Sequence, residues 1–280
     1  MSRQVTSIYK TYKPGIIRIA ACVLFYLSFC GICAAQTLSI SSQECEYIGG
    51  RVFANECSSK DDNLEVWNQD EEFLSLGIGH FIWYPKNTKK IYNESFTRFL
   101  DYAAANGIKI PDWIDAKSGA PCPWNSRDDF LLSLDSPEAK DLKGFLRATK
   151  NLQVAFVVER ANESLLIMFN ALDPEEREKI MRRFVAVSST PNGRYALVDY
   201  INFKGCGISA TERYNGKGWG LLQVLSGMED LKDGDDALKE FVRSAKRVLE
   251  ERVANSPASR NEKQWLAGWK NRVGSYLKAA

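Results

Sequence analysis

The residue of this sequence best placed for proton-transfer chemistry is Glu56, which follows a predicted helix. Ser41 and Glu44 have the spacing of a capping box, and apolar residues recur at helical intervals after them, so a helix is expected over 41–55. A carboxyl group at the C-terminal end of a helix lies beside the negative end of the helix dipole, which disfavours its ionisation. A glutamic acid held in this way can act as a general acid that protonates a leaving oxygen.

A glycine-rich motif follows about twenty residues after Glu56. Gly77-Ile78-Gly79-His80-Phe81 resembles the active-site hairpin of phage-type lysozymes, in which a helix delivers the catalytic glutamate and a Gly-Ile-Gly-His strand forms the floor of the cleft. That family also has a hydroxyl residue two positions before the first glycine, where it helps to hold the attacking water, and Ser75 occupies this position here. The resemblance implies that Glu56 and Ser75 are catalytic.

Phage-type lysozymes carry a second carboxylate several residues before the hydroxyl residue. Asp70, Glu71 and Glu72 lie near the corresponding place without matching the spacing. We expect Glu71 to contact the substrate in this region. Phe81 and Trp83 are close enough in sequence to supply an apolar wall, with Trp83 as a face on which a sugar ring can stack.

A second motif, residues 218–224 (Gly-Trp-Gly-Leu-Leu-Gln-Val), resembles the Gly-Leu-Met-Gln stretch of goose-type lysozymes and lytic transglycosylases, which belong to the same superfamily. The glutamine lines the sugar cleft in those proteins, which implies that Gln223 and its neighbour Trp219 contact the substrate. Their catalytic glutamate ends the preceding helix, where this sequence has Cys206. The nearest acid is Glu212, which makes Glu212 the alternative proton donor.

His80 is the only histidine of the chain, which restricts the chemistry. A zinc site built on several histidines is excluded, and a Ser-His-Asp triad could use no other base. We interpret His80 as a structural hydrogen-bonding residue that lies beside the substrate. A thiol nucleophile formed by Cys206 and His80 is an alternative that no spacing supports. We therefore expect no metal site and no cofactor.

The first 35 residues are predicted to be a secretory signal peptide. They contain four basic residues and no acidic residue, then a 14-residue apolar run (19–32) and the small-residue sequence Cys33-Ala34-Ala35. The run is shorter than a membrane-spanning helix, which needs about 20 residues. An uncleaved membrane anchor is the alternative. The mature protein, residues 36–280, is expected to be periplasmic or secreted and to have no membrane span.

The mature chain would be nearly neutral, because removing four of the 37 basic residues leaves 33 against 35 acidic ones. A nucleic-acid-binding protein needs a strongly basic face, so this class is excluded. The remaining 245 residues are rich in aromatic side chains and can bury a sizeable core. We expect a single lysozyme-like domain with a helical insertion around 86–190, a stretch that neither motif covers.

The predicted fold class is mainly α (α+β), a lysozyme-like helical domain with one or two small β-hairpins that form a cleft. Short apolar runs and glycines over 64–83 indicate a hairpin or small sheet, and 205–220 is a glycine-rich loop. Further helices are expected, several of them opened by a capping residue and proline, near 94–105, 127–134, 137–171 (as one helix or two), 174–188, 194–203, 221–225 and 235–253.

Four cysteines remain after the signal, namely Cys45, Cys57, Cys122 and Cys206, in a compartment that permits disulfides. They allow three pairings, between which the sequence does not choose. A continuous helix would separate Cys45 from Cys57 by about 18 Å, which is too far for a bond. We expect any bridge to involve Cys122 or Cys206.

Together these features predict cleavage of the glycan strands of peptidoglycan, of the lysozyme or lytic transglycosylase type, with a glutamate as general acid. The partner is the glycan strand, and the oligomeric state is left open. A wall-binding protein that keeps the cleft but has lost its acid is one alternative. A scaffold or inhibitor that uses the helices of 94–188 is another, which exposed aromatic patches on that segment would favour.

The signal-peptide hypothesis gives a first testable prediction. Exported protein should begin at or near Gln36, because the apolar run and the small residues before it fit cleavage at that bond. N-terminal sequencing of the exported material measures this directly. Recovery of a product that still begins at Met1 and stays in the membrane would show that the segment is an anchor.

Overall fold

The computed structural model describes residues 37–57, 60–114, 119–229 and 233–278. This part of the chain is mainly helical with two small antiparallel sheets, which confirms the predicted mainly α (α+β) class. The helices are α2 (Ser42–Cys57), α3 (Phe96–Ala105), α4 (Arg127–Leu132), α5 (Pro137–Ala148), α6 (Lys150–Asn170), α7 (Pro174–Ser188), α8 (Pro191–Lys204), α9 (Leu221–Ser226), α10 (Gly234–Asn255) and α11 (Leu266–Gly274). The strands are β1 (Glu65–Val66), β2 (Leu74–Leu76), β3 (Phe81–Trp83), β4 (Arg213–Tyr214) and β5 (Lys217–Gly218).

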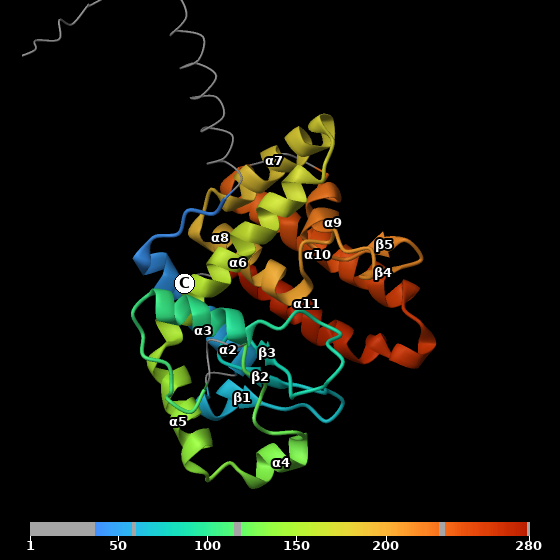
Figure 1. Cartoon of the computed structure of the whole chain (residues 1–280). Helices are drawn as coiled ribbons and strands as arrows, with labels where there is room; N and C mark the ends of the chain where they lie inside the picture. The colour runs from blue at the N-terminus through green and yellow to red at the C-terminus, as the bar shows by residue number, and fades with distance from the viewer. Residues whose placement is uncertain (1–36, 58–59, 115–118, 230–232, 279–280) are drawn as a thin grey trace, which may run out of the picture.

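Helix α6 connects two halves of the molecule (Figure 1). One half contains α2 to α5 and the sheet β1–β3, and the other contains α7 to α11 and the hairpin β4–β5. Helix α6 packs against α2 and α3 in the first half and against α7 and α8 in the second. The stretch 86–190, which we expected to be an insertion, therefore includes the helix on which both halves pack.

Most helices begin where the sequence signals predict. The Glu44 N–H donates to Ser41 Oγ (3.3 Å) and the Ser41 N–H donates to the Glu44 carboxylate (3.1 Å), which confirms the capping box of α2. Proline opens α5, α7 and α8, and the side chains of Ser136, Asp173 and Thr190 cap their first turns. The fixed φ of proline and its missing N–H suit this position.

The predicted helix over 137–171 is two helices, α5 and α6, because the chain leaves helical geometry at Thr149. The Thr149 hydroxyl donates to the Phe145 carbonyl (2.8 Å) in the turn before it. Hydroxyl groups that bond back to their own helix in this way compete with the backbone ladder and bend helices. This break allows α6 to run in a different direction from α5, between the two halves of the molecule.

The sheet β1–β3 has β2 at its centre, which confirms the hairpin or small sheet predicted over 64–83. Ser75 pairs with Val66 on β1 and with Ile82 on β3. Side chains of directly paired residues point to the same face, and those of their neighbours point to the other. Ser75 and Ile82 therefore share one face, while Leu74 and Trp83 are buried on the opposite one.

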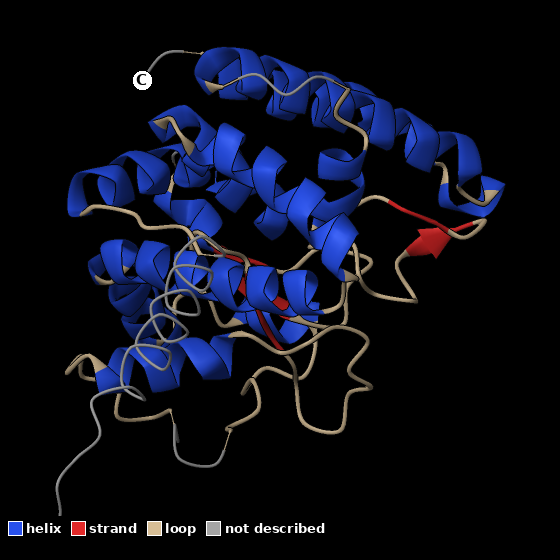
Figure 2. Cartoon of the chain, turned by 90° about the horizontal axis from the view of Figure 1, so that it is seen from above, coloured by secondary structure: helices blue, strands red, loops and turns tan. Residues whose placement is uncertain are grey.

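The glycine-rich segment after α8 contains a second hairpin, β4–β5, which lies at the edge of the molecule (Figure 2). We predicted a loop here. Helix α11, near the C-terminus, was not predicted either, because its nine residues include two glycines. Packing against α10 stabilises it, which is a tertiary effect that local propensity does not report.

Three of the four cysteines expected in the mature protein, Cys45, Cys122 and Cys206, carry free thiols, so no bridge through Cys122 or Cys206 is formed. Helix α2 runs unbroken from before Cys45 to Cys57, as the separation argument required.

The predicted signal peptide lies outside the described residues. Within the described ranges, no helix combines the length and the apolar character needed to cross a membrane.

Gln153, fully buried on α6, holds the turn after β2 in place. Its side-chain oxygen accepts a hydrogen bond from the Ile78 N–H (2.9 Å), and its nitrogen donates to the Leu146 carbonyl (2.7 Å) and to the Thr149 hydroxyl (2.9 Å). A Cβ atom at Gly77 would overlap the Gln153 side-chain oxygen. The glycine is therefore required both for its left-handed backbone and for the close approach of α6.

Replacing this buried amide should destabilise the protein. We expect Gln153→Leu to lower the free energy of unfolding by about 2–4 kcal/mol, because each buried group left without a partner costs about 1–3 kcal/mol. Denaturant unfolding measures the difference. Gln43→Leu, at an exposed position of α2, is the matched control and should change stability by less than about 0.5 kcal/mol. Equal stability of the two variants would contradict the role of Gln153.

Candidate active site

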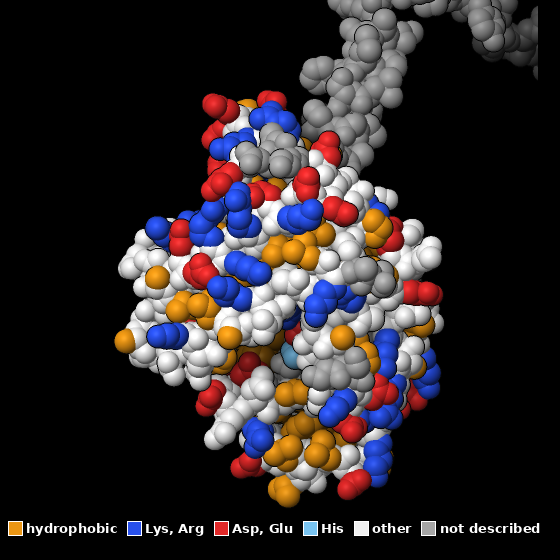
Figure 3. All heavy atoms as spheres, turned by 180° about the vertical axis from the view of Figure 1, so that it is seen from behind, with side chains coloured by type: hydrophobic (Ala, Val, Ile, Leu, Met, Phe, Trp, Pro, Cys, Tyr) orange, Lys and Arg blue, Asp and Glu red, His pale blue; other side chains and the backbone are white. Residues whose placement is uncertain are grey.

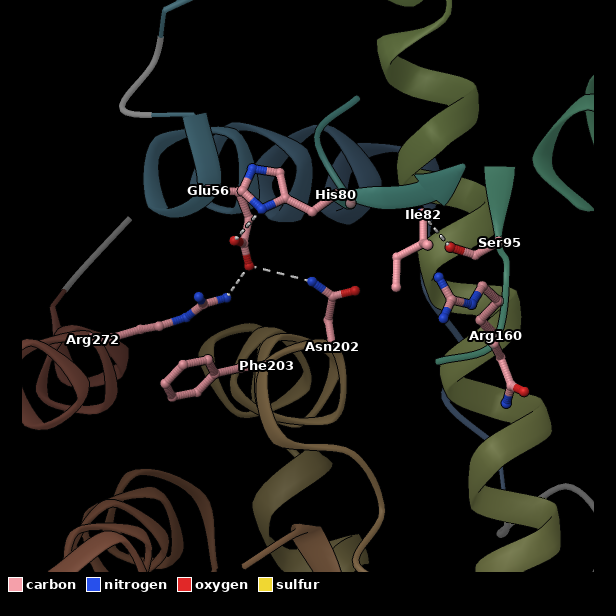
Figure 4. Close-up of a pocket in the computed structure, with 10 residues that line it drawn as sticks. Glu56, His80, Ile82, Ser95, Arg160, Asn202, Phe203 and Arg272 are labelled. Carbon is pink, nitrogen blue, oxygen red and sulfur yellow. Dashed lines mark hydrogen bonds and ion pairs between the residues drawn. The ribbon is translucent and has the colours of Figure 1, made fainter. Parts of the chain in front are cut away.

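A cleft of about 330 Å³ opens between the two halves of the molecule (Figures 3 and 4). Its size is within the range of pockets that bind small ligands. Figure 3 shows it as a hollow in which the histidine side chain is visible. It is lined by Glu56, Gly79, His80, Ile82, Asn93, Ser95, Arg160, Asn202, Phe203 and Arg272, which come from α2, the sheet region, α6, α8 and α11.

Glu56 projects from the last turn of α2 into this cleft (Figure 4). Its Oε1 accepts a hydrogen bond from the Arg272 guanidinium (2.6 Å) and a longer one from the Asn202 amide (3.4 Å). Its Oε2 lies 3.5 Å from His80 Nδ1. The side chain is 13% exposed, so its carboxyl group reaches solvent only through the cleft. The structure thus brings together Glu56 and His80, two residues predicted for the site.

Arg272 joins Glu56 to Asp199, which is fully buried on α8. Its Nε and Nη2 donate to the two Asp199 oxygens (2.9 and 2.8 Å), and the Tyr276 hydroxyl (2.5 Å) and the Asn55 amide (3.2 Å) also donate to this carboxylate. Burial alone lowers the pKa of Arg272, but the charge of Asp199 and the hydrogen bonds to it, with Glu56 in addition, raise it well above the ordinary value. Arg272 therefore stays charged.

Two carboxylates share this single guanidinium. With Glu56 ionised, the group Glu56–Arg272–Asp199 carries a net charge of −1, and with Glu56 protonated it is neutral. Arg272 keeps two hydrogen bonds to Asp199 in addition to its one to Glu56, so the position of the guanidinium does not depend on Glu56 alone.

The turn between β2 and β3 positions His80 against Glu56. Gly77 (φ +68°) and His80 (φ 45°) both have left-handed backbone, and the His80 N–H donates to the Gly77 carbonyl (3.2 Å). His80 Nδ1 faces Glu56, whereas Nε2 is buried without a hydrogen-bond partner among the described residues. The hydrogen-bonding capacity of this nitrogen is therefore not used by any described residue.

The other residues predicted beside this motif lie outside the cleft lining. Ser75 is buried on the sheet face that it shares with the cleft residue Ile82. Trp83 lies on the opposite face, where it is 1% exposed and donates to the Ala120 carbonyl (2.7 Å). Glu71 is in the loop between β1 and β2. Ser75 is thus next to the cleft, and the structure does not bring Trp83 or Glu71 to it.

The second motif lies apart from the cleft. The side chain of Gln223 binds two backbone groups, accepting from the Gly220 N–H (2.9 Å) and donating to the Gly207 carbonyl (3.1 Å). Trp219 is buried beside β4, and Glu212 is exposed. None of these side chains lines the cleft with Glu56. Through these two hydrogen bonds, the Gln223 amide holds the loop before α9 in place.

Cys206 is not suited to act as a nucleophile with His80. Burial raises the pKa of the Cys206 thiol to about 12, although a hydrogen bond with Ser164 acts in the opposite direction. The thiolate is the reactive form of cysteine, and it is scarce at neutral pH when the pKa is this high. Cys206 also does not line the cleft in which His80 lies.

Sequence reasoning missed Asp199, Asn202 and Arg272. Asp199 has a recognisable signal, because it is an acid inside the buried run 195–201 of α8. Asn202 follows that run one helical turn after Val198, with no distinctive pattern of its own. Arg272 lies on the helix that was not predicted, and its partners are 73 and 216 residues away along the chain.

Neither a metal site nor a known relative identifies the cleft. Among residues of the described ranges, no three or more His, Cys, Asp or Glu side chains gather so that they could hold a metal ion. Comparison of the chain with protein-family models, with curated proteins and with solved structures gave no match.

Lys204 lies behind the cleft in a row of alternating cations and aromatic rings. Its Nζ is 4.0 Å from the ring centroid of Phe203 and 3.6 Å from that of Trp269, and Arg252 and Arg272 lie over the same two rings. Burial lowers the pKa of Lys204 to about 6, and the charges of Arg252 and Arg272 act in the same direction. The rings favour the charged amine by about 0.5–2 kcal/mol, which is less than the cost of burying it.

This burial makes stability depend on pH. The unfolded chain keeps the Lys204 proton up to a pKa of about 10.5, whereas the folded protein loses it near 6, so the unfolded state binds more protons between these values. The free energy of unfolding should then rise with pH by up to about 1.4 kcal/mol per unit across this window. Lys204→Met removes the slope and should be more stable than the wild type, most of all at pH 6 and below.

Thermal or denaturant unfolding at pH 6, 8 and 10 measures this effect. The difference between Lys204→Met and the wild type should shrink as the pH rises. Lys179→Met, at an exposed position of α7, serves as the control and should follow the wild type at every pH. A constant difference between Lys204→Met and the wild type would show that Lys204 is charged in the folded protein.

Proposed function

We propose that this protein cleaves the glycan strands of peptidoglycan and that Glu56 is the general acid. The observation that carries the proposal is the position of Glu56, at the end of a helix, facing the Gly77–His80 turn across a cleft between two halves of the molecule. The cleft is wide enough for a small ligand, and Asn202 and Ser95 add neutral hydrogen-bonding groups of the kind that sugars use.

In the proposed reaction, the carboxyl group of Glu56 donates its proton to the glycosidic oxygen as the bond from this oxygen to C1 breaks. An oxygen nucleophile forms the new bond to C1. Water gives hydrolysis, and its proton returns to the Glu56 carboxylate. The C6 hydroxyl of the same sugar gives a 1,6-anhydro end, and its proton returns in the same way. Arg272, held by Asp199, stabilises the carboxylate of Glu56 between the two proton transfers.

Glu56 is the only acidic side chain among the described residues that line the cleft. Asp70, Glu72 and Glu212 are exposed, and Glu71 lies in the loop between β1 and β2. A mechanism with one glutamate fits this lining: the acetamido oxygen of the substrate's own N-acetyl group bonds to C1 as the glycosidic bond breaks, and that bond breaks in turn when water or the C6 hydroxyl attacks C1. Ser75, on the same sheet face as Ile82, is the candidate to hold water at this side of the cleft.

The proposal also includes the place of action. Peptidoglycan lies outside the cytoplasmic membrane, and residues 1–35 have the composition of a signal peptide. We propose that the mature protein acts in the periplasm or outside the cell.

A second candidate function is binding of the glycan without cleavage. One observation favours it: Arg272 and Asn202 already donate hydrogen bonds to Glu56, and a side chain held in this way can orient a bound sugar without transferring a proton. The third alternative, a scaffold that uses 94–188, has less support. The exposed large apolar residues in the described part of that segment are aliphatic, namely Ile108, Leu131, Leu132, Leu134, Ile167 and Val185.

Removing the proposed proton donor tests the cleavage proposal. Glu56→Gln should reduce lysis of purified cell wall by roughly two to four orders of magnitude, because the amide keeps the size of the side chain but cannot donate the proton in the same way. The rate of turbidity loss measures lysis, and circular dichroism checks the fold. Glu212→Gln, at an exposed acid outside the cleft, is the matched control and should keep wild-type activity.

The outcomes separate the candidates. Loss of activity only in Glu212→Gln would move the proton donor to the second motif. Retention of the glycan by a wild type that shows no lysis would favour the binding function. If the wild type neither lyses nor binds cell wall, both candidates are wrong.

A further inference from the structure

A second charged group lines the cleft away from Glu56. Arg160 reaches from α6 to the wall of the cleft beside Ile82 and Ser95 (Figure 4). Its guanidinium makes no hydrogen bond and no ion pair with any described residue, and it lies 5.9 Å from the centroid of the Phe156 ring. Arg160 is partly buried, and burying a guanidinium is costly unless an anion pairs with it.

The acid whose charge acts on Arg160 is already paired with another arginine. Glu163, one turn further along α6, accepts a hydrogen bond from Arg98 on α3 (2.7 Å). Burial lowers the pKa of Arg160, the neighbouring Arg98 lowers it further, and Glu163 opposes both effects. Among the described residues that line the cleft, Arg160 is the only charged side chain at this end.

The opposite end of the cleft has the opposite balance, because Glu56 and Asp199 share Arg272 there. A ligand that spans the cleft therefore meets a region able to take up a proton at one end and an unpaired guanidinium at the other. Ser95 lies at the Arg160 end, and Ser95 and Asn93, which also lines the cleft, offer neutral hydrogen-bonding groups. A sugar that carries a carboxylate to one side of its ring matches this arrangement.

We propose that Arg160 is a recognition site for a carboxylate carried by the substrate, either the lactyl carboxylate of an N-acetylmuramic acid residue or a carboxylate of the peptide attached there. The planar guanidinium can bind both oxygens of such a group, and an ion pair in a partly buried cleft is stronger than one at the surface. The site distinguishes peptidoglycan from chitin, whose sugars carry no carboxylate. The sugar part of this inference rests on the proposed function.

Titration calorimetry with three disaccharides of N-acetylglucosamine and N-acetylmuramic acid tests the site. The first has a free lactyl carboxylate, the second has it as a methyl ester, and the third has it joined to an alanyl-glutamate dipeptide. The full-length mature protein should bind at least one of the two charged ligands ten-fold or more tightly than the ester. Preference for the first assigns the lactyl group, and preference for the third assigns the peptide.

Three variants assign this preference to Arg160. Arg160→Gln should bind charged ligands and ester equally, and Arg160→Lys should keep part of the preference because it retains the charge without the planar fork. Arg182→Gln, at an exposed arginine of α7 outside the cleft, should keep all of it. A wild type with no preference, or a preference that persists in Arg160→Gln, would overturn the proposal.

A sugar-free probe separates this inference from the proposed function. Sodium lactate should shift the Nε–Hε nuclear magnetic resonance signal of Arg160, identified by its loss in Arg160→Lys, while sodium chloride at the same ionic strength should not. If no disaccharide binds but lactate shifts this signal, the glycan function fails and the carboxylate site stands. If lactate leaves the signal unchanged and no disaccharide discriminates, the carboxylate site fails.

Discussion

The guanidinium of Arg272 lies between two carboxylates from different helices, and the candidate active site depends on this contact. Asp199 is fully buried, and a buried charge without partners would cost several kcal/mol, so Arg272 and Tyr276 must stay in place. Their contacts with Asp199 fix α11 and the C-terminal turn against α8. Glu56, at the end of α2, meets the same guanidinium from the other half of the molecule. The cleft exists where these parts of the chain converge.

A second constraint acts through α6. Gln153 holds the backbone of the Gly77–His80 turn. This turn places His80 beside Glu56. One turn after the buried Phe156, the same helix carries Arg160 into the cleft. Helix α6 therefore sets the position of both the turn and the unpaired cation. The cleft differs in charge along its length because Glu56 and Asp199 share Arg272 at the end built by α2, α8 and α11, whereas Arg160 of α6 is the charged side chain at the other end.

The sequence predicted features whose causes are local. Capping residues and prolines fix the starts of α2, α5 and α7, and short apolar runs fix the three-stranded sheet. Helix α8 begins at Pro191, three residues before its predicted start at Arg194. The proximity of Glu56 and His80 was also predicted, because both belong to a motif within one short stretch of the chain. Arg272 could not be predicted, since it comes from a helix stabilised by packing and its partners are remote in sequence. Gln223 and Trp219 match the residue types of a cleft motif but do not line the cleft. The Gln223 side chain binds nearby backbone groups, and Trp219 packs beside the hairpin β4–β5.

The central claim is that a single glutamate in this cleft breaks the bond between sugar units. Mass spectrometry of the fragments released from purified peptidoglycan tests it most directly, because the new ends record which bond was cut. The account predicts fragments whose new ends lie at C1 of a sugar, as reducing ends after attack by water or as 1,6-anhydro ends after attack by the C6 hydroxyl. Fragments cut only within the peptides, with the glycan strands intact, would contradict it, and so would the absence of any new fragment.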